Sequence, residues 1–329
     1  MVFITAVMIT ALTFILMVDL LIVVHEAGHM LAAKRFGAEV IEVSVGLGPV
    51  LFEKKIRGTA YTIRFLPIGG FCHMMDNGDG SALSRAVISL AGPLANLALG
   101  FAGAILMLSI FGYNPPLVGS TLDDQPVYGV LMEGDLITHV DGHRVFFSSE
   151  ADELARLAPE GPLKIRWERD GRPMSGMLSA DDVEGRRNIG AVFCQKKERC
   201  RPQELLPLSA HYVWSETRSI YLTVANILKG KPVVRVSDFV SKDSDDSDTD
   251  IPSAADILEL IMAFFFGYSV KAGAANLLPL PSLDGGHIVL AVLEGLTGIS
   301  MDRIRPVLKK IAVLFIMGSA IRIILSGSG

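Results

Sequence analysis

The residues best suited to chemistry lie in the pentapeptide His25-Glu26-Ala27-Gly28-His29. On a helix, histidines four residues apart face the same side, where both can bind one zinc ion. Glu26 follows the first histidine, and its carboxylate can take a proton from a water molecule that such a metal activates. The pentapeptide therefore indicates metal-assisted hydrolysis, with His25 and His29 as zinc ligands and Glu26 as catalytic base.

A hydrolytic zinc site needs a third protein ligand and keeps its fourth position for water. Asp284 is our candidate, because it follows an apolar stretch that Pro279 and Pro281 break. Backbone groups freed by such a break must find partners in a cavity or a substrate. His287 is the competing ligand. We favour Asp284 because histidine ligands are already supplied and the glycine pair after Asp284 suggests close packing.

The elements that position these residues belong to a membrane protein. The chain has 329 residues, of which 50% are hydrophobic, and a mean hydropathy of +0.43. These values argue against an ordinary soluble enzyme. The net charge of −5 and the 7% aromatic content give no cationic, base-stacking surface, so we expect no nucleic-acid partner. The three cysteines lack the paired spacing of a cysteine zinc module.

Four apolar stretches predict a polytopic α-helical membrane protein with about four transmembrane helices. The first carries one charge, Asp19, and a signal peptide is its alternative interpretation. We favour a retained helix, because no basic residue precedes it and the His-Glu-Ala-Gly-His motif follows where a cleavage site would be expected. The four predicted spans are Val2 to Val24, Ala86 to Ile110, Leu260 to Leu280 and Ile311 to Leu325.

The distribution of basic residues predicts the orientation of these spans. Lysines and arginines are concentrated between the first and second spans and again before the fourth. The positive-inside rule therefore places residues 30–85 in the cytoplasm and residues 112–253 on the other side. It also brings His25, His29 and Asp284 to the same, cytoplasmic level of the bilayer.

Three segments outside the predicted spans have distinct sequence patterns. Residues 38–75 alternate apolar positions with glycine-rich turns, which predicts membrane-associated β-hairpins. Val118 to Phe193 combines short β-like runs with one helical stretch, Ser149 to Leu157, and predicts a small β-rich domain. Ser237 to Ser253 holds six aspartates with repeated serines, so we expect a solvated linker rather than an ion site.

Three motifs together resemble the site-2 protease family of intramembrane zinc metalloproteases: His25 to His29 in the first span, Gly92 to Asn96 in the second, and Asn276 to Gly286 in the third. The resemblance covers residues 1–111 and about 255–325. It implies zinc bound by His25, His29 and Asp284, with Glu26 as base. It further implies that Asn276 holds the substrate backbone or the oxyanion. The hairpins from Gly46 to Phe71, with Gly46 and Gly48, would pair with an unwound substrate.

The resemblance extends to Gly134 to Gly142, which is similar to the signature of a PDZ domain. One PDZ-like unit suggests the RseP-like branch, which implies a bacterial inner-membrane enzyme that cuts transmembrane anti-sigma factors or remnant signal peptides. A peptide C-terminus would bind the extracytoplasmic PDZ-like domain. The expected organisation is a membrane core in two halves, 1–111 and 254–329, around a PDZ-like domain at 117–195 and a connecting segment at 196–253.

Two other functions compete with the protease. A non-proteolytic scaffold that uses the PDZ-like domain would have no need of Glu26 beside a metal. A metal transporter would place ligands along a path through several spans, whereas the candidate ligands gather at one depth. The sequence favours the protease over both.

Overall fold

The computed structural model describes residues 2–75, 80–121, 130–158, 161–178, 189, 191–194, 196–229, 253–301, 307 and 310. The chain divides into two compact units, one of Met1–Gly100 with Ile261–Gly329 and one of Phe101–Leu260. The predicted fourth span, 311–325, lies outside the described residues, as does nearly all of the acidic linker.

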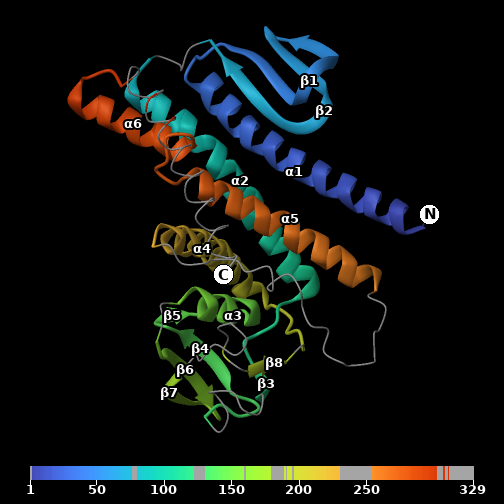
Figure 1. The fold of residues 1–329 in the computed structure, drawn as a ribbon, viewed down its shortest axis with the longest axis vertical. Helices are drawn as coiled ribbons and strands as arrows, with labels where there is room; N and C mark the ends of the chain where they lie inside the picture. The colour runs from blue at the N-terminus through green and yellow to red at the C-terminus, as the bar shows by residue number, and fades with distance from the viewer. Residues whose placement is uncertain are drawn as a thin grey trace, which may run out of the picture. The chain divides into compact units, whose positions relative to one another are not determined.

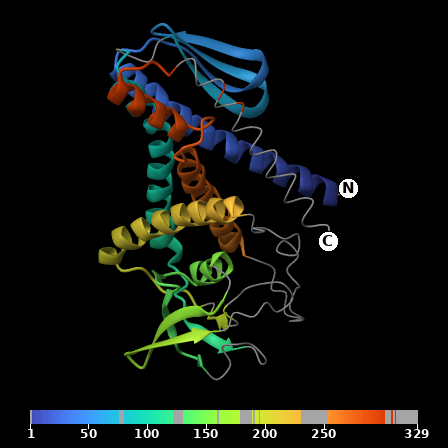
Figure 2. The same ribbon diagram turned by 60° about the vertical axis from the view of Figure 1, so that its left-hand side comes forward.

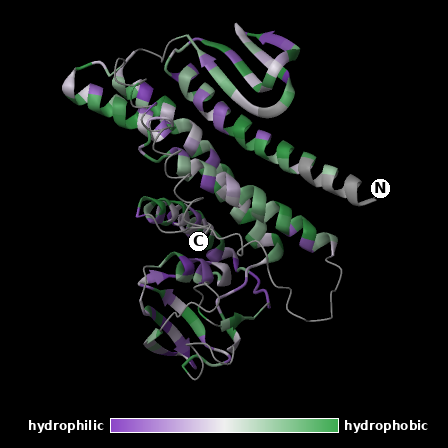
Figure 3. Ribbon diagram, in the orientation of Figure 1, coloured by the Kyte–Doolittle hydropathy of each residue, from purple (hydrophilic) through white to green (hydrophobic). Residues whose placement is uncertain are grey.

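Three long apolar helices form the frame of the first unit (Figure 1): α1 (Val2–Arg35), α2 (Ala82–Phe111) and α5 (Ala254–Asn276). Each contains a segment long and apolar enough to cross a membrane, as the hydropathy colouring shows (Figure 3). These helices correspond to the first three predicted spans. The first helix continues to Arg35, so the His25 to His29 motif lies on helix, as its spacing requires.

Small residues allow these helices to pack backbone against backbone. A Cβ atom at Gly28 would lie 2.5 Å from the Ala91 carbonyl oxygen on α2, and one at Gly273 of α5 would lie 2.8 Å from that of Pro93. Such close contacts are typical of helix interfaces inside membranes. Gly28 therefore brings the metal motif directly against α2.

A long antiparallel hairpin of β1 (Val40–Ile56) and β2 (Thr59–Met74) follows α1. It turns at Arg57 and Gly58, both with positive φ. Many of its apolar side chains are exposed, among them Leu51, Phe52 and Phe65. The hairpin is tied to α1 where the Gly69 amide donates to a buried Asp19 carboxylate oxygen at 2.9 Å.

The second unit contains the predicted small β-rich domain. A sheet in the order β5-β4-β6-β7 and a separate β3-β8 pair surround a core that includes Ile137, Ile165 and Trp167. The predicted helix is present as α3 (Ser148–Leu157). The strands are β3 (Val118–Thr121), β4 (Leu136–Val140), β5 (His143–Arg144), β6 (Leu163–Arg169), β7 (Arg172–Leu178) and β8 (Ala191–Phe193).

A helix that the sequence did not predict, α4 (Pro202–Leu228), packs against α3 within this unit (Figure 2). It occupies the first half of the segment that we expected only to connect the domain to the third span. The unit also includes the last turns of α2 and the first turns of α5, since the division falls at residues 100 and 260.

Candidate active site

The structure brings His25, His29 and Asp284 together, with one ligand atom of each within 4.8 Å of the others. The Nε2 atoms of the two histidines are 3.1 Å apart. Asp284 Oδ2 lies 3.0 Å from His25 Nε2 and 3.5 Å from His29 Nε2. Donors about 2.0 Å from a tetrahedral zinc ion are about 3.3 Å apart, so these donors have the spacing of a zinc site.

Two local structures present these donors. Helix α1 supplies both histidines from one face, because they are four residues apart. Asp284 is the first residue of α6 (Asp284–Thr297), which begins after the proline-containing break that follows α5. Its carboxylate oxygen Oδ2 faces the Nε2 atoms of both histidines. A carboxylate in this position can bind the same metal ion as the two imidazoles.

Gly92 on α2 provides the space in which the three donors meet. A Cβ atom at this position would lie 2.3 Å from His29 Nε2 and 2.9 Å from His25 Nε2. Both distances are shorter than any van der Waals contact, and both involve the nitrogen atoms that face Asp284. A side chain at position 92 would therefore collide with the two nitrogen atoms that would bind the metal.

Contacts from α2 orient both imidazoles. His29 Nδ1 lies 2.7 Å from the Ile88 carbonyl oxygen, so Nδ1 carries the proton and Nε2 is free to bind metal. Asn96 places its amide nitrogen 3.4 Å from His25 Nδ1, while its buried Oδ1 has no hydrogen-bond partner among the described residues. A half-turn of the amide would let Oδ1 accept the His25 Nδ1 proton and leave Nε2 for the metal.

Glu26 lines a cavity of about 350 Å³ together with His29 and Asp284. The Cys72 backbone hydrogen-bonds to its carboxylate and holds it at the cavity wall. A carboxylate beside a metal position is suited to accept a proton from water. His287, the competing ligand, also lines the cavity but is not a member of the three-donor cluster.

The expected substrate-binding residues lie elsewhere in the first unit. Asn276 is the last residue of α5 and is not among the residues that line the cavity. Gly46 and Gly48 both lie in β1 with positive φ. A Cβ atom at Gly46 would lie 2.4 Å from the Leu66 carbonyl oxygen, so glycine is needed there for the hairpin itself. The substrate-binding roles of these residues stay predictions.

Sequence reasoning did not single out Ile88, and it named Gly92 and Asn96 only within the motif that carries the resemblance, without a role in the site. Their spacing of four residues places them on one face of α2, the face toward the two histidines. A signal was present, because Asn96 is the one amide in an otherwise uncharged apolar span and lies four residues after a glycine.

This chain is similar to known metalloproteases over most of its length. The sequence profile of peptidase family M50 matches residues 13–319. The zinc metalloprotease RasP of Geobacillus kaustophilus is 24% identical over 89% of this chain and 91% of its own length. The membrane metalloprotease ARASP of Arabidopsis thaliana chloroplasts is 26% identical over 84% of this chain and 69% of its own. A Campylobacter jejuni protein is 26% identical over 85% of this chain and 82% of its own.

Among solved structures, the PDZ domain of an SdrC-like protein from Listeria monocytogenes is 31% identical over 23% of this chain, with a TM-score of 0.21. The PDZ-like assignment of residues 117–195 stays a prediction.

Proposed function

The chain belongs to peptidase family M50, and from this premise we propose that it is a zinc metalloprotease that cleaves transmembrane helices within the bilayer. The observation that supports the proposal best is the meeting of His25, His29 and Asp284 beside Glu26 on membrane helices. Ionisable groups inside a membrane are costly and are usually functional. The proposed substrates are single-pass membrane proteins, such as anti-sigma factors, or remnant signal peptides.

His25, His29 and Asp284 would hold the zinc ion, which supplies Lewis-acid activation of a water molecule when bound. Glu26 accepts a proton on its carboxylate and passes it to the amine that leaves when the peptide bond breaks. The Ile88 carbonyl and the Asn96 amide keep the imidazoles oriented during this transfer.

A transmembrane helix hides its peptide bonds in internal hydrogen bonds, so a substrate must unwind locally before hydrolysis. We propose that the β1–β2 hairpin pairs with the unwound chain through its edge, and that Asn276 contacts the substrate backbone. The proposed orientation places the active site toward the cytoplasm and the small β-rich domain on the other side of the membrane. There the domain would bind substrates as a PDZ-like module. A bacterial inner membrane suits this arrangement.

Cleavage of a model transmembrane peptide by the full chain in proteoliposomes tests the function. Wild type, Glu26→Gln and the exposed control Glu133→Gln should all bind zinc, and Glu26→Gln should cleave about 10² to 10⁴ times more slowly. Unchanged cleavage by Glu26→Gln would refute the assigned base. Zinc binding without cleavage by wild type would favour a scaffold, and zinc flux across the vesicles a transporter.

A further inference from the structure

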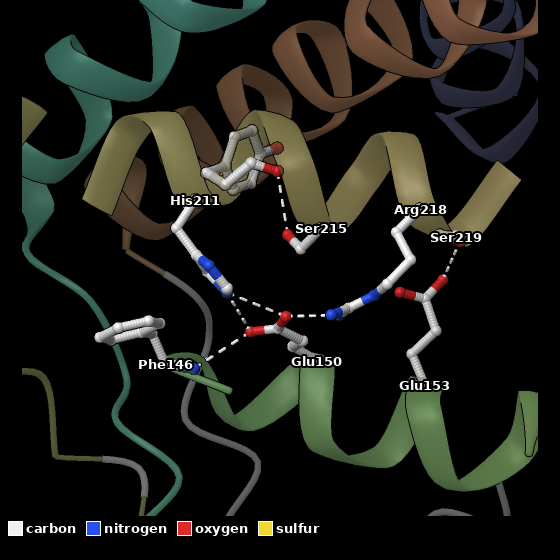
Figure 4. Close-up of polar contacts among 8 residues, drawn as sticks. Phe146, Glu150, Glu153, His211, Ser215, Arg218 and Ser219 are labelled. Atoms are coloured by element: carbon white, nitrogen blue, oxygen red, sulfur yellow. Dashed lines mark hydrogen bonds and ion pairs between the residues drawn. The ribbon is translucent and has the colours of Figure 1, made fainter. Parts of the chain in front are cut away.

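Helix α4 is held against α3 by its polar side (Figure 4). Glu150 of α3, only 4% exposed, accepts hydrogen bonds from His211 Nε2 at 3.0 Å and Arg218 Nη2 at 2.5 Å. The Phe146 amide donates to the same carboxylate at 3.1 Å. Burial raises the pKa of Glu150, but these partners outweigh it and hold the pKa below its usual value. The carboxylate therefore stays charged and paired.

Further polar contacts continue along the same face of α4. Ser219 Oγ donates to Glu153 Oε1 at 2.5 Å, and Asn226 Nδ2 donates to the Leu157 carbonyl oxygen at 3.1 Å. Together with His211, these residues follow one face of α4 for about four turns. The rotation of α4 about its own axis is thereby set by its contacts with α3.

The exposed side of α4 carries an apolar stripe. Its members are Leu206, Trp214, Tyr221 and Leu228, which are 61%, 60%, 41% and 62% exposed. They recur at steps of eight, seven and seven residues, which is two helical turns, so they share one face. The side of α4 that faces α3 makes the polar contacts, although Leu222 also packs against the core of the β-rich domain. The exposed side instead carries large apolar residues, which a surface helix in water usually turns inward.

The segment before α4 contacts the ends of two candidate membrane spans. The backbone of Glu198 exchanges two hydrogen bonds with Tyr113, two residues after α2 ends. Lys197 forms an ion pair with Glu259, in the first turns of α5. Tryptophan and tyrosine are the side chains that prefer the boundary between lipid and water.

We propose that α4 lies in the interface of the lipid bilayer, with the stripe of Leu206, Trp214, Tyr221 and Leu228 among the upper parts of the acyl chains. Its polar side would hold the small β-rich domain to the membrane surface through α3. This surface is separate from the hydrolytic site and does not depend on the proposed function.

Tryptophan fluorescence tests the proposal in the full chain, which has two tryptophans. Trp167 is 3% exposed in the core of the β-rich domain, whereas Trp214 belongs to the stripe. The protein is reconstituted in phosphatidylcholine vesicles that carry a nitroxide either near the glycerol backbone or at the acyl-chain end. Wild type and Trp214→Phe are compared, so that their difference reports Trp214 alone. Trp167 emission serves as the check on folding.

The proposal predicts that the shallow nitroxide removes most of the Trp214 component and the deep nitroxide removes less, while aqueous iodide has little effect. Trp214→Phe should lose this lipid-dependent quenching. Quenching of Trp214 by iodide but by neither lipid would overturn the proposal and show a surface open to water. Protection from all three quenchers would also overturn it, because the stripe would then be covered by protein.

Discussion

His29 Nδ1 lies 2.7 Å from the carbonyl oxygen of Ile88, a residue 59 positions later on the neighbouring helix. This hydrogen bond gives His29 the tautomer that binds metal through Nε2. Gly92, one turn further along α2, keeps the space beside that nitrogen open. Helices α1 and α2 therefore form the site together, although α2 supplies none of the three donors.

Replacing Gly92 tests this joint construction. Gly92→Ala leaves all three donors unchanged but places a methyl group 2.3 Å from His29 Nε2. We expect bound zinc, measured as metal per chain, to fall at least about tenfold, comparable to losing a residue that orients a ligand. Leu94→Ala, at an exposed position of the same helix, should keep its zinc. Full zinc content in Gly92→Ala would contradict the assigned metal position.

Substitutions of Asp284 and His287 distinguish these two candidates for the third zinc ligand. Asp284→Asn should weaken zinc binding strongly, because an amide cannot replace the carboxylate that faces both imidazoles. His287→Gln should retain zinc, since His287 lines the cavity outside the three-donor cluster. Competition with a fluorescent chelator measures both affinities. The reverse order would transfer the ligand role to His287.

Asp19 is predicted to position the hairpin. Asp19→Leu removes the acceptor of the Gly69 amide, whereas Asp19→Asn keeps an oxygen at that place. We expect Asp19→Leu to raise the KM for a transmembrane peptide several-fold with unchanged zinc content, and Asp19→Asn to stay closer to wild type. Equal KM values for wild type and both variants would show that the contact between Asp19 and the hairpin does not affect substrate binding.

Asp152 in α3 should make the stability of the β-rich domain depend on pH. Burial raises its pKa from 3.8 to about 6. The folded state thus binds the proton more tightly than the unfolded state, so stability is lost as pH rises from about 4 through 6. Asp152→Asn should stabilise the domain by about 1 to 3 kcal/mol at pH 7.5 and have little effect near pH 4.

Thermal unfolding followed by Trp167 emission measures this difference, with Asp170→Asn, in the exposed turn after β6, as the matched control. A stabilisation that is equal at both pH values would assign the effect of Asp152→Asn to something other than its charge.

The sequence predicted the parts of the site that depend on local geometry. His25 and His29 share a face because four residues make about one helical turn, and Asp284 was placed at their level by span boundaries and basic loops. The contacts of Ile88 and Asn96 with the imidazoles could not be predicted, because they depend on how α1 and α2 rotate and cross. The two helices pack closely through Gly28, which is a tertiary feature.

Helix α4 was missed for a related reason. Its exposed apolar residues are two turns apart, and serines, His211 and Arg218 interrupt its apolar residues. The sequence therefore shows neither the continuous apolar run of a span nor the core stripe of a soluble helix. The contacts of α4 with α3, such as those of His211 and Arg218 with Glu150, show which side faces the protein. Once the side that contacts α3 is known, the remaining apolar residues of α4 can be identified as an exposed stripe.

Zinc K-edge X-ray absorption of the full chain tests the central claim most directly. The account predicts one zinc per chain in a four-coordinate shell of nitrogen and oxygen at about 2.0 to 2.1 Å, with the scattering pattern of two imidazoles, and a changed shell in Asp284→Asn. A shell that contains sulfur, or a wild-type shell that Asp284→Asn leaves intact, would contradict it.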